Sequence, residues 1–242
     1  MQRLARFLVC GFFIVAAGCA AKAPWEQVDY DRQAKAYTNL GFGYLEQGQT
    51  GRALRDFRKA LNVRAFYVEA LHGTALALQQ QGELALAESY FEQALQAKSS
   101  QVSHQKDSQT AIRNNYAAFL FSQSRYDEAR KQLERVSKDV YYTDRVLVFT
   151  NLGYVSIKLE QSAQAIAYFQ QALALNPSFI LPHQALLALR SKQQEWQQAE
   201  RHWFVLRDAQ TNDDATLKQA LIVVQNTGNQ KEVNYINGLL NQ

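Results

Sequence analysis

Cysteine and proline are scarce in this chain of 242 residues. The two cysteines, Cys10 and Cys19, both lie in the N-terminal segment, and there are only three prolines. No thiol is therefore available to the rest of the chain for a disulfide framework or a thiolate metal site. Because proline ends helices and is nearly absent, while strong helix formers such as Ala, Leu, Gln and Lys are abundant, the composition favours an all-α fold.

A strong charge of one sign is also missing. The chain has 26 basic and 22 acidic residues, a formal net charge of +4. Arg3 and Arg6 lie in a segment that we expect to be removed, which leaves 24 basic residues against 22 acidic ones. Binding to nucleic acid needs basic residues gathered on one face. The excess is too small and too scattered for that, so no nucleic-acid partner is predicted.

Groups that could carry catalysis are missing as well. The four histidines (His72, His104, His183 and His202) are widely separated and have no metal-ligand spacing. The chain has no P-loop, no HExxH and no GxSxG motif. We therefore expect no enzymatic activity, no metal, no cofactor and no small-molecule substrate.

The N-terminus has the pattern of a secretory signal peptide. Arg3 and Arg6 precede the apolar run FLVCGFFIVAA, which is too short at about 1.5 Å per residue to cross a bilayer core of roughly 30 Å. The run ends at Ala16-Ala17-Gly18-Cys19, which resembles the bacterial lipobox, although leucine is more usual than Ala16 at its first position. Residues 1–18 are therefore predicted to be a cleaved signal peptide.

Cys19 is predicted to carry the covalent lipid, palmitate included, and residues 19–30 to form a tether. Two or more acyl chains anchor a protein stably, whereas one chain does not. Ala20 rather than aspartate follows the cysteine, which favours the periplasmic face of the outer membrane. The alternative is an ordinary signal peptide that ends near Ala20, with Cys19 incidental.

The rest of the chain repeats with a period of about 34 residues, typical of tetratricopeptide repeats (TPR). Units are predicted to start near residues 34, 68, 110, 146, 180 and 214, with an eight-residue insertion at 102–109 before the third. The first unit supplies the TPR residues at positions 4, 7, 8, 11, 20, 24 and 27: Tyr37, Leu40, Gly41, Tyr44, Ala53, Phe57 and Ala60. The fourth unit matches most cleanly and the sixth least.

Each repeated position has a physical role. Small residues at positions 8, 20 and 27 let helices A and B of a unit approach closely, and large residues at 4, 11 and 24 fill the gaps between units. Gly48, Gly82 and Gly228 fall at position 15, in the turn between helices A and B, where a positive φ is required. The predicted fold is a right-handed TPR superhelix over residues 31–242, with the A helices lining its concave face and the last unit as a cap.

The concave face is the predicted binding site for a protein partner. Apolar residues and asparagines at positions 6, 9 and 12 of the A helices would bury the side chains of a peptide and bond to its backbone. The alternative is that these aromatic residues only pack against the next unit. The carboxylate clamp of chaperone-binding TPR domains is absent, because position 9 lacks asparagine. The predicted groove residues are Phe42, Leu45, Leu76, Asn115, Phe121, Tyr154 and Ile157.

Beyond the TPR pattern, the segments NNYAAFLFSQSRYDEA (from Asn114) and TDRVLVFTNLG (to Gly153) resemble the type IV pilus lipoproteins known as pilotins of the PilF/PilW type. The resemblance implies an outer-membrane lipoprotein of six TPR units that helps the pilus secretin to insert and multimerise. It also implies that the early-unit groove, Phe42, Leu45 and Leu76, takes the secretin segment. A TPR lipoprotein scaffold of another envelope machine, such as β-barrel assembly or a peptidoglycan hydrolase complex, remains the alternative.

Overall fold

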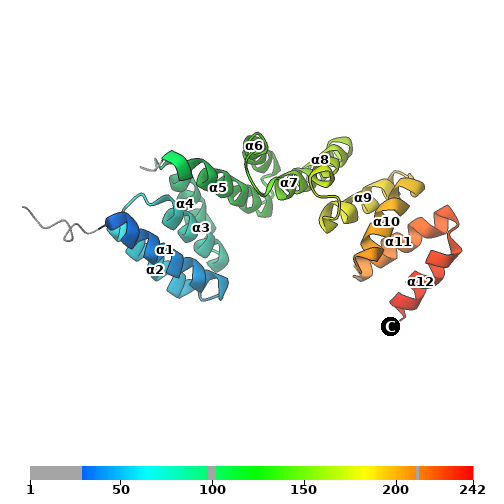
Figure 1. Cartoon of the computed structure of the whole chain (residues 1–242), viewed down its shortest axis with the longest axis horizontal. Helices are drawn as coiled ribbons and strands as arrows, with labels where there is room; N and C mark the ends of the chain where they lie inside the picture. The colour runs from blue at the N-terminus through cyan, green and yellow to red at the C-terminus, as the bar shows by residue number, and fades with distance from the viewer. Residues whose placement is uncertain (1–28, 98–101, 211–212, 242) are drawn as a thin grey trace, which may run out of the picture.

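The computed structural model describes residues 29–97, 102–210 and 213–241, which form twelve α-helices and no strand (Figure 1). The helices follow one another as six antiparallel pairs, as predicted for six TPR units. They are α1 (Tyr30–Glu46), α2 (Thr50–Val63), α3 (Val68–Gln81), α4 (Leu84–Gln96), α5 (Val102–Ser122), α6 (Tyr126–Ser137), α7 (Arg145–Lys158), α8 (Ser162–Leu175), α9 (Ile180–Lys192), α10 (Trp196–Asp208), α11 (Asp214–Thr227) and α12 (Gln230–Leu240).

The predicted signal peptide and the lipidated Cys19 lie outside the described residues. Within them, no helix combines the length and the apolarity that a membrane span would need. The predicted insertion at 102–109 lies within α5, which has 21 residues and is the longest helix described. The insertion therefore lengthens the A helix of the third unit at its N-terminal end.

Packing follows the predicted repeat register. Position 24 holds fully buried rings, including Phe57 and Phe169, against small residues at position 8. A Cβ added to Gly41 would lie 2.5 Å from the Phe57 ring, and one added to Gly153 would lie 2.5 Å from the Phe169 ring. Only glycine lets these A helices approach the rings so closely. Alanine at position 20 is likewise fully buried in the first five units, at residues Ala53, Ala87, Ala129, Ala165 and Ala199.

Position 15 has the same backbone conformation in all six units. Its φ is 70° at Gly48, 81° at Gly82 and 74° at Gly228, as the sequence predicted. The structure adds that the three units without glycine also use the left-handed region, with φ values of 60° at Ser124, 59° at Glu160 and 59° at Gln194. The turn geometry is therefore set by the repeat and not by the residue type.

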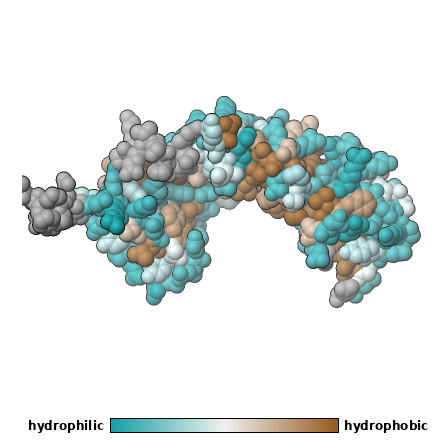
Figure 2. Space-filling model, viewed as in Figure 1, coloured by the Kyte–Doolittle hydropathy of each residue, from teal (hydrophilic) through white to brown (hydrophobic). Residues whose placement is uncertain are grey.

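The helical pairs stack into an arch (Figure 1). Along the described residues, the A helices of successive units contact one another, whereas the B helices of successive units do not. The A helices are therefore closer to one another than the B helices are, and they form the inner layer of the arch. Figure 2 shows hydrophobic residues gathered along the inner side of the arch, toward its centre and its C-terminal half.

Candidate functional site

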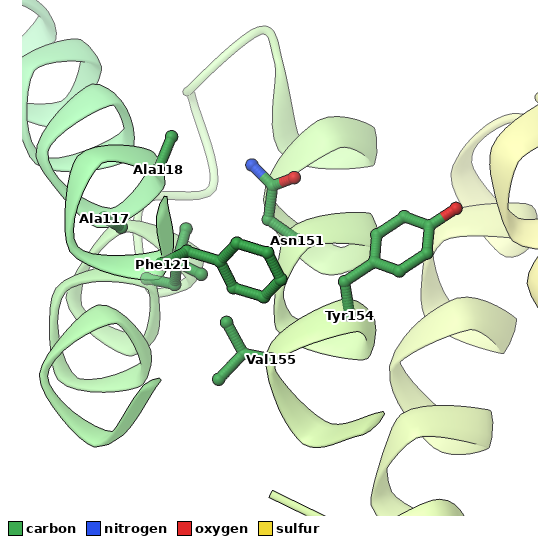
Figure 3. A pocket seen from close by; sticks show the side chains of 7 residues that line it. Ala117, Ala118, Phe121, Asn151, Tyr154 and Val155 are labelled. Carbon is green, nitrogen blue, oxygen red and sulfur yellow. The ribbon is translucent and has the colours of Figure 1, made fainter. Parts of the chain in front are cut away.

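A pocket opens in the inner layer between the A helices of the third and fourth units, α5 and α7. Its volume is about 200 Å³. Phe121 of α5 and Tyr154 of α7, both predicted groove residues, contribute to its wall (Figure 3). The B helix α6 contributes Leu133. The full lining is Ala117, Ala118, Phe121, Leu133, Asn151, Tyr154 and Val155.

The pocket lies where the third unit has no aromatic ring at position 24. Leu133 stands at position 24, where Phe57, Phe91 and Phe169 stand in the first, second and fourth units. Ala117 faces it from position 8. An aliphatic side chain at position 24 fills less space than a phenyl ring, so room remains between α5 and α7. The lining residues Leu133 and Val155 are not among the predicted groove residues, although the absence of a ring at position 24 is visible in the repeat pattern.

The two aromatic residues of the pocket are held by neighbours. The Phe121 ring packs edge-on against Tyr126, with centroids 5.3 Å apart. Tyr154 packs edge-on against Phe169 at 5.3 Å, and its hydroxyl donates to the carbonyl of Leu181 at 3.4 Å, as it points toward α9 (Figure 3). Burial raises the pKa of Tyr154, so its hydroxyl keeps its proton. Fixed side chains of this kind make a preformed pocket.

The asparagines at position 6 connect neighbouring A helices. Asn151 donates from Nδ2 to Oδ1 of Asn114 at 3.3 Å, which joins α7 to α5. Asn115 lies 3.0 Å from Nε2 of His72, which joins α5 to α3. Burial lowers the pKa of His72 to about 4, so at neutral pH the ring is uncharged and Nε2 can accept from the amide of Asn115. The predicted groove residue Asn115 therefore already has a partner within the inner layer.

The remaining predicted groove residues lie outside the pocket. Leu45 is 9% exposed and belongs to the core between the first two units. Phe42 and Leu76 are half-buried at its edge, with the Phe42 ring 5.2 Å from that of Phe57. Ile157 is half-buried against the core shared by the fourth and fifth units. The structure thus brings together Phe121 and Tyr154 and leaves the early-unit residues mostly in packing positions.

The helices around the pocket have an uneven charge. α7 and α9 contain no aspartate or glutamate. Each ends in an exposed lysine, Lys158 and Lys192 respectively. Across the residues that the structure describes, no three His, Cys, Asp or Glu side chains are placed to hold a metal ion. The site is thus an apolar pocket, and the helix that carries Tyr154 ends in an exposed lysine.

Sequence comparison with protein families identifies tetratricopeptide repeats at residues 38–102 and again at 146–179. The chain therefore contains TPR repeats, and its fold is a solenoid of helical repeats. It is similar to the type IV pilus assembly protein PilF of Pseudomonas aeruginosa, with 38% identity over 147 residues. That match covers 60% of this chain and 55% of the relative, so it spans about half the relative's length.

Solved structures extend the similarity over most of the chain. The structure of Pseudomonas aeruginosa PilF superposes with a TM-score of 0.77 and 28% identity, and covers 86% of this chain and 90% of that one. The structure of PilW, described as a widely conserved type IV pilus biogenesis factor, gives a TM-score of 0.72 at 22% identity over 86% of this chain. The PilW match supports the fold alone.

Proposed function

We propose that this protein is a lipoprotein scaffold of type IV pilus assembly. In this proposal a lipid on Cys19 anchors it to the periplasmic face of the outer membrane. There it binds the pilus secretin and promotes insertion and multimerisation of the secretin. The observation that supports the proposal most is the similarity to PilF, which extends along nearly the whole solenoid at 28% identity and reaches 38% over 147 residues.

The pocket between α5 and α7 is the proposed binding site for one apolar side chain of the secretin segment. It is apolar, preformed and open to the inner side of the arch, and a buried anchor side chain commonly dominates the energy of such contacts. Lys158 and Lys192 favour acidic residues in the same segment, because complementary charges steer association and fix orientation. The early-unit residues Phe42 and Leu76 extend the apolar surface toward the first units.

A substitution at the mouth of the pocket tests this site. Ala118 is exposed and lines the pocket, so Ala118→Trp should fill it without disturbing the core. The matched control is Ala188→Trp, because Ala188 is also exposed and occupies the same position 9 of a unit, in α9. Loss of an anchor contact of about 1.4 kcal/mol or more predicts at least a roughly tenfold weaker affinity for purified secretin with Ala118→Trp only. Equal affinities of the two variants would exclude the pocket as the site.

Deletion of the gene tests the wider function. If the proposal is correct, secretin remains monomeric on semi-native gels and pili are lost, while other outer-membrane barrels assemble normally. Normal secretin multimers in the deletion strain would favour a scaffold of another envelope machine. Mass spectrometry of the N-terminal peptide tests the anchor, since a mature chain that begins with an unmodified Ala20 would contradict lipidation of Cys19.

A further inference from the structure

The outer face of α2, in the unit nearest the proposed anchor, has a strong positive charge. Arg52, Arg55, Arg58 and Lys59 are all exposed on the side of α2 opposite its buried residues. The acidic residue of the helix, Asp56, is buried and accepts from Lys59 at 2.7 Å. Arg55 and Arg58, in the middle of the helix, have no carboxylate partner among the described residues. The exposed face of α2 is therefore cationic with no acid in it.

Two exposed aromatic residues lie at the end of this helix. Phe66, in the connection between α2 and α3, is 67% exposed, and Tyr30, the first residue of α1, is 61% exposed. Arg64 forms an ion pair with Asp31, which holds the connection beside the start of α1. The C-terminal end of α2, Phe66 and the N-terminus of the solenoid thus share one end of the first unit. Arg55, Arg58 and Lys59 of α2 with Tyr30 and Phe66 are called the basic edge below; Arg52 lies at the other end of α2, bonded to Gln49.

Among the described residues, neither the opposite end of the first unit nor the B helices α6 and α8 has an exposed face with basic residues and no acid. The opposite end is the turn Gln47-Gly48-Gln49, which carries no charge of its own, although Arg52 bonds to Gln49 there. Among the other B helices, α8 carries no charged residue. α6 mixes acids with bases, and its Arg130 is paired with both Asp127 and Glu134 of the same helix. A protein surface whose only role is to be solvated is expected to carry charges of both signs, as α6 does.

We propose that the basic edge lies on the membrane surface, with its arginines on anionic phospholipid headgroups and Phe66 in the headgroup region. The inference rests on the proposed lipid anchor at Cys19. Nine residues lie between Cys19 and Asp29, so ten Cα-to-Cα steps, whatever their conformation, keep the start of α1 within about 35 Å of the bilayer. Basic residues close to an anionic surface are attracted to it, and aromatic rings favour the interface.

This contact sets the orientation of the arch. A lipid on a ten-residue tether allows the solenoid to turn freely, whereas a second contact at one end of the first unit fixes which end faces the lipid. The inner side of the remaining units is then held away from the membrane plane and open to a partner. Since the attraction is electrostatic, it weakens when salt shortens the screening length to a few ångströms.

The test uses the full lipidated chain in vesicles and a fluorescent probe on a single introduced cysteine. The described body has no cysteine, and lipid would block the thiol of Cys19, so only the new thiol reacts. Ala65→Cys places an NBD probe beside Phe66 without removing it, and Gln47→Cys places the control probe at the opposite end of the same unit. Vesicles contain phosphatidylcholine with or without phosphatidylglycerol, and a nitroxide on the headgroup of some phospholipids quenches any probe that reaches the interface.

We expect at least about twofold stronger quenching at position 65 than at position 47 with phosphatidylglycerol, and loss of the difference in high salt. Arg55→Gln with Arg58→Gln should lower the quenching at 65 roughly threefold or more. The matched control, Lys131→Gln with Arg135→Gln on exposed sites of α6, should leave it unchanged.

The possible failures are distinguishable. If the protein floats with the vesicles but probes 65 and 47 are quenched equally, or if the α2 substitutions have no effect, the basic edge does not contact lipid and the anchor stands. If the protein does not float and its Cys19 reacts with the probe, the anchor is wrong and the inference falls with it.

Discussion

The fourth and fifth units solve the same packing problem in different ways. In the fourth unit, Gly153 at position 8 lies directly against the Phe169 ring. In the fifth unit the same two positions hold Leu187 and Trp203, which are 1% and 0% exposed. The repeat therefore does not require a small residue at position 8. It requires that the pair of residues at positions 8 and 24 fills the space between helices A and B.

The larger ring of the fifth unit has a further consequence. The indole Nε1 of Trp203 donates to Oε2 of Glu232 in α12 at 3.0 Å, and Arg207 donates to Oε1 of the same carboxylate at 2.7 Å. Glu232 is only 4% exposed, and these two bonds offset the cost of burying its charge. The Phe169 ring has no polar group with which to make such a bond. The tryptophan thus connects the fifth unit to the sixth.

Exchange of the position 8 residues separates the two arrangements, and the largest effect is expected in the fifth unit. Leu187→Gly removes a fully buried side chain beside Trp203 and places glycine within a helix. Cavity formation costs about 3 kcal/mol and glycine roughly 1, so the free energy of unfolding should fall by about 4 kcal/mol. Denaturant titration followed by tryptophan emission measures it, because Trp196 and Trp203 both lie in α10.

The control for that exchange is Ala188→Gly, on the exposed side of the same helix. It carries the helix cost of glycine without a cavity, so it should lose only about 1 kcal/mol. If both variants lose the same free energy, Leu187 does not fill the space beside Trp203.

The reverse exchange in the fourth unit should have a smaller effect. Gly153→Leu forces a side chain into the position of the Phe169 ring, which costs about 3 kcal/mol, and replacing a mid-helix glycine returns roughly 1. We expect a net loss of about 2 kcal/mol in a thermal or denaturant melt. Gly43→Leu is the control, since no atom lies within 4 Å of a Cβ at Gly43 and the change should be neutral or stabilising. An unchanged melt of Gly153→Leu would contradict the packing at position 8.

Much of the fold was predictable from the sequence because the TPR register is a packing rule repeated six times. The unit starts near residues 68, 180 and 214 coincide with the first residues of α3, α9 and α11. The candidate site was less predictable. Position 9 residues share a register, but whether Phe42 packs on Phe57 or lines a groove depends on how far neighbouring A helices are apart. In the third unit the room comes from position 24, where Leu133 in place of a ring lines the pocket beside Phe121 and Tyr154.

The smallest expected effects concern the turns, where the fourth and fifth units again differ from the glycine-containing ones. Glu160 and Gln194 have positive φ values near those of Gly48 and Gly82, at a cost of about 1 kcal/mol each for a residue with a Cβ. Glu160→Gly removes that cost but increases the entropy of the unfolded chain by a similar amount, so the free energy of unfolding should change by less than about 0.5 kcal/mol. Gly82→Ala is the reverse change: the cost of a Cβ at positive φ is offset by the lower entropy of the unfolded chain. Nothing lies within 4 Å of the added Cβ, so the two terms should nearly cancel, and the free energy of unfolding should again change by less than about 0.5 kcal/mol. Denaturant midpoints at constant slope measure both changes. A loss above about 1 kcal/mol in Glu160→Gly would mean that the glutamate side chain stabilises the turn, and that the left-handed conformation is not imposed by the repeat alone.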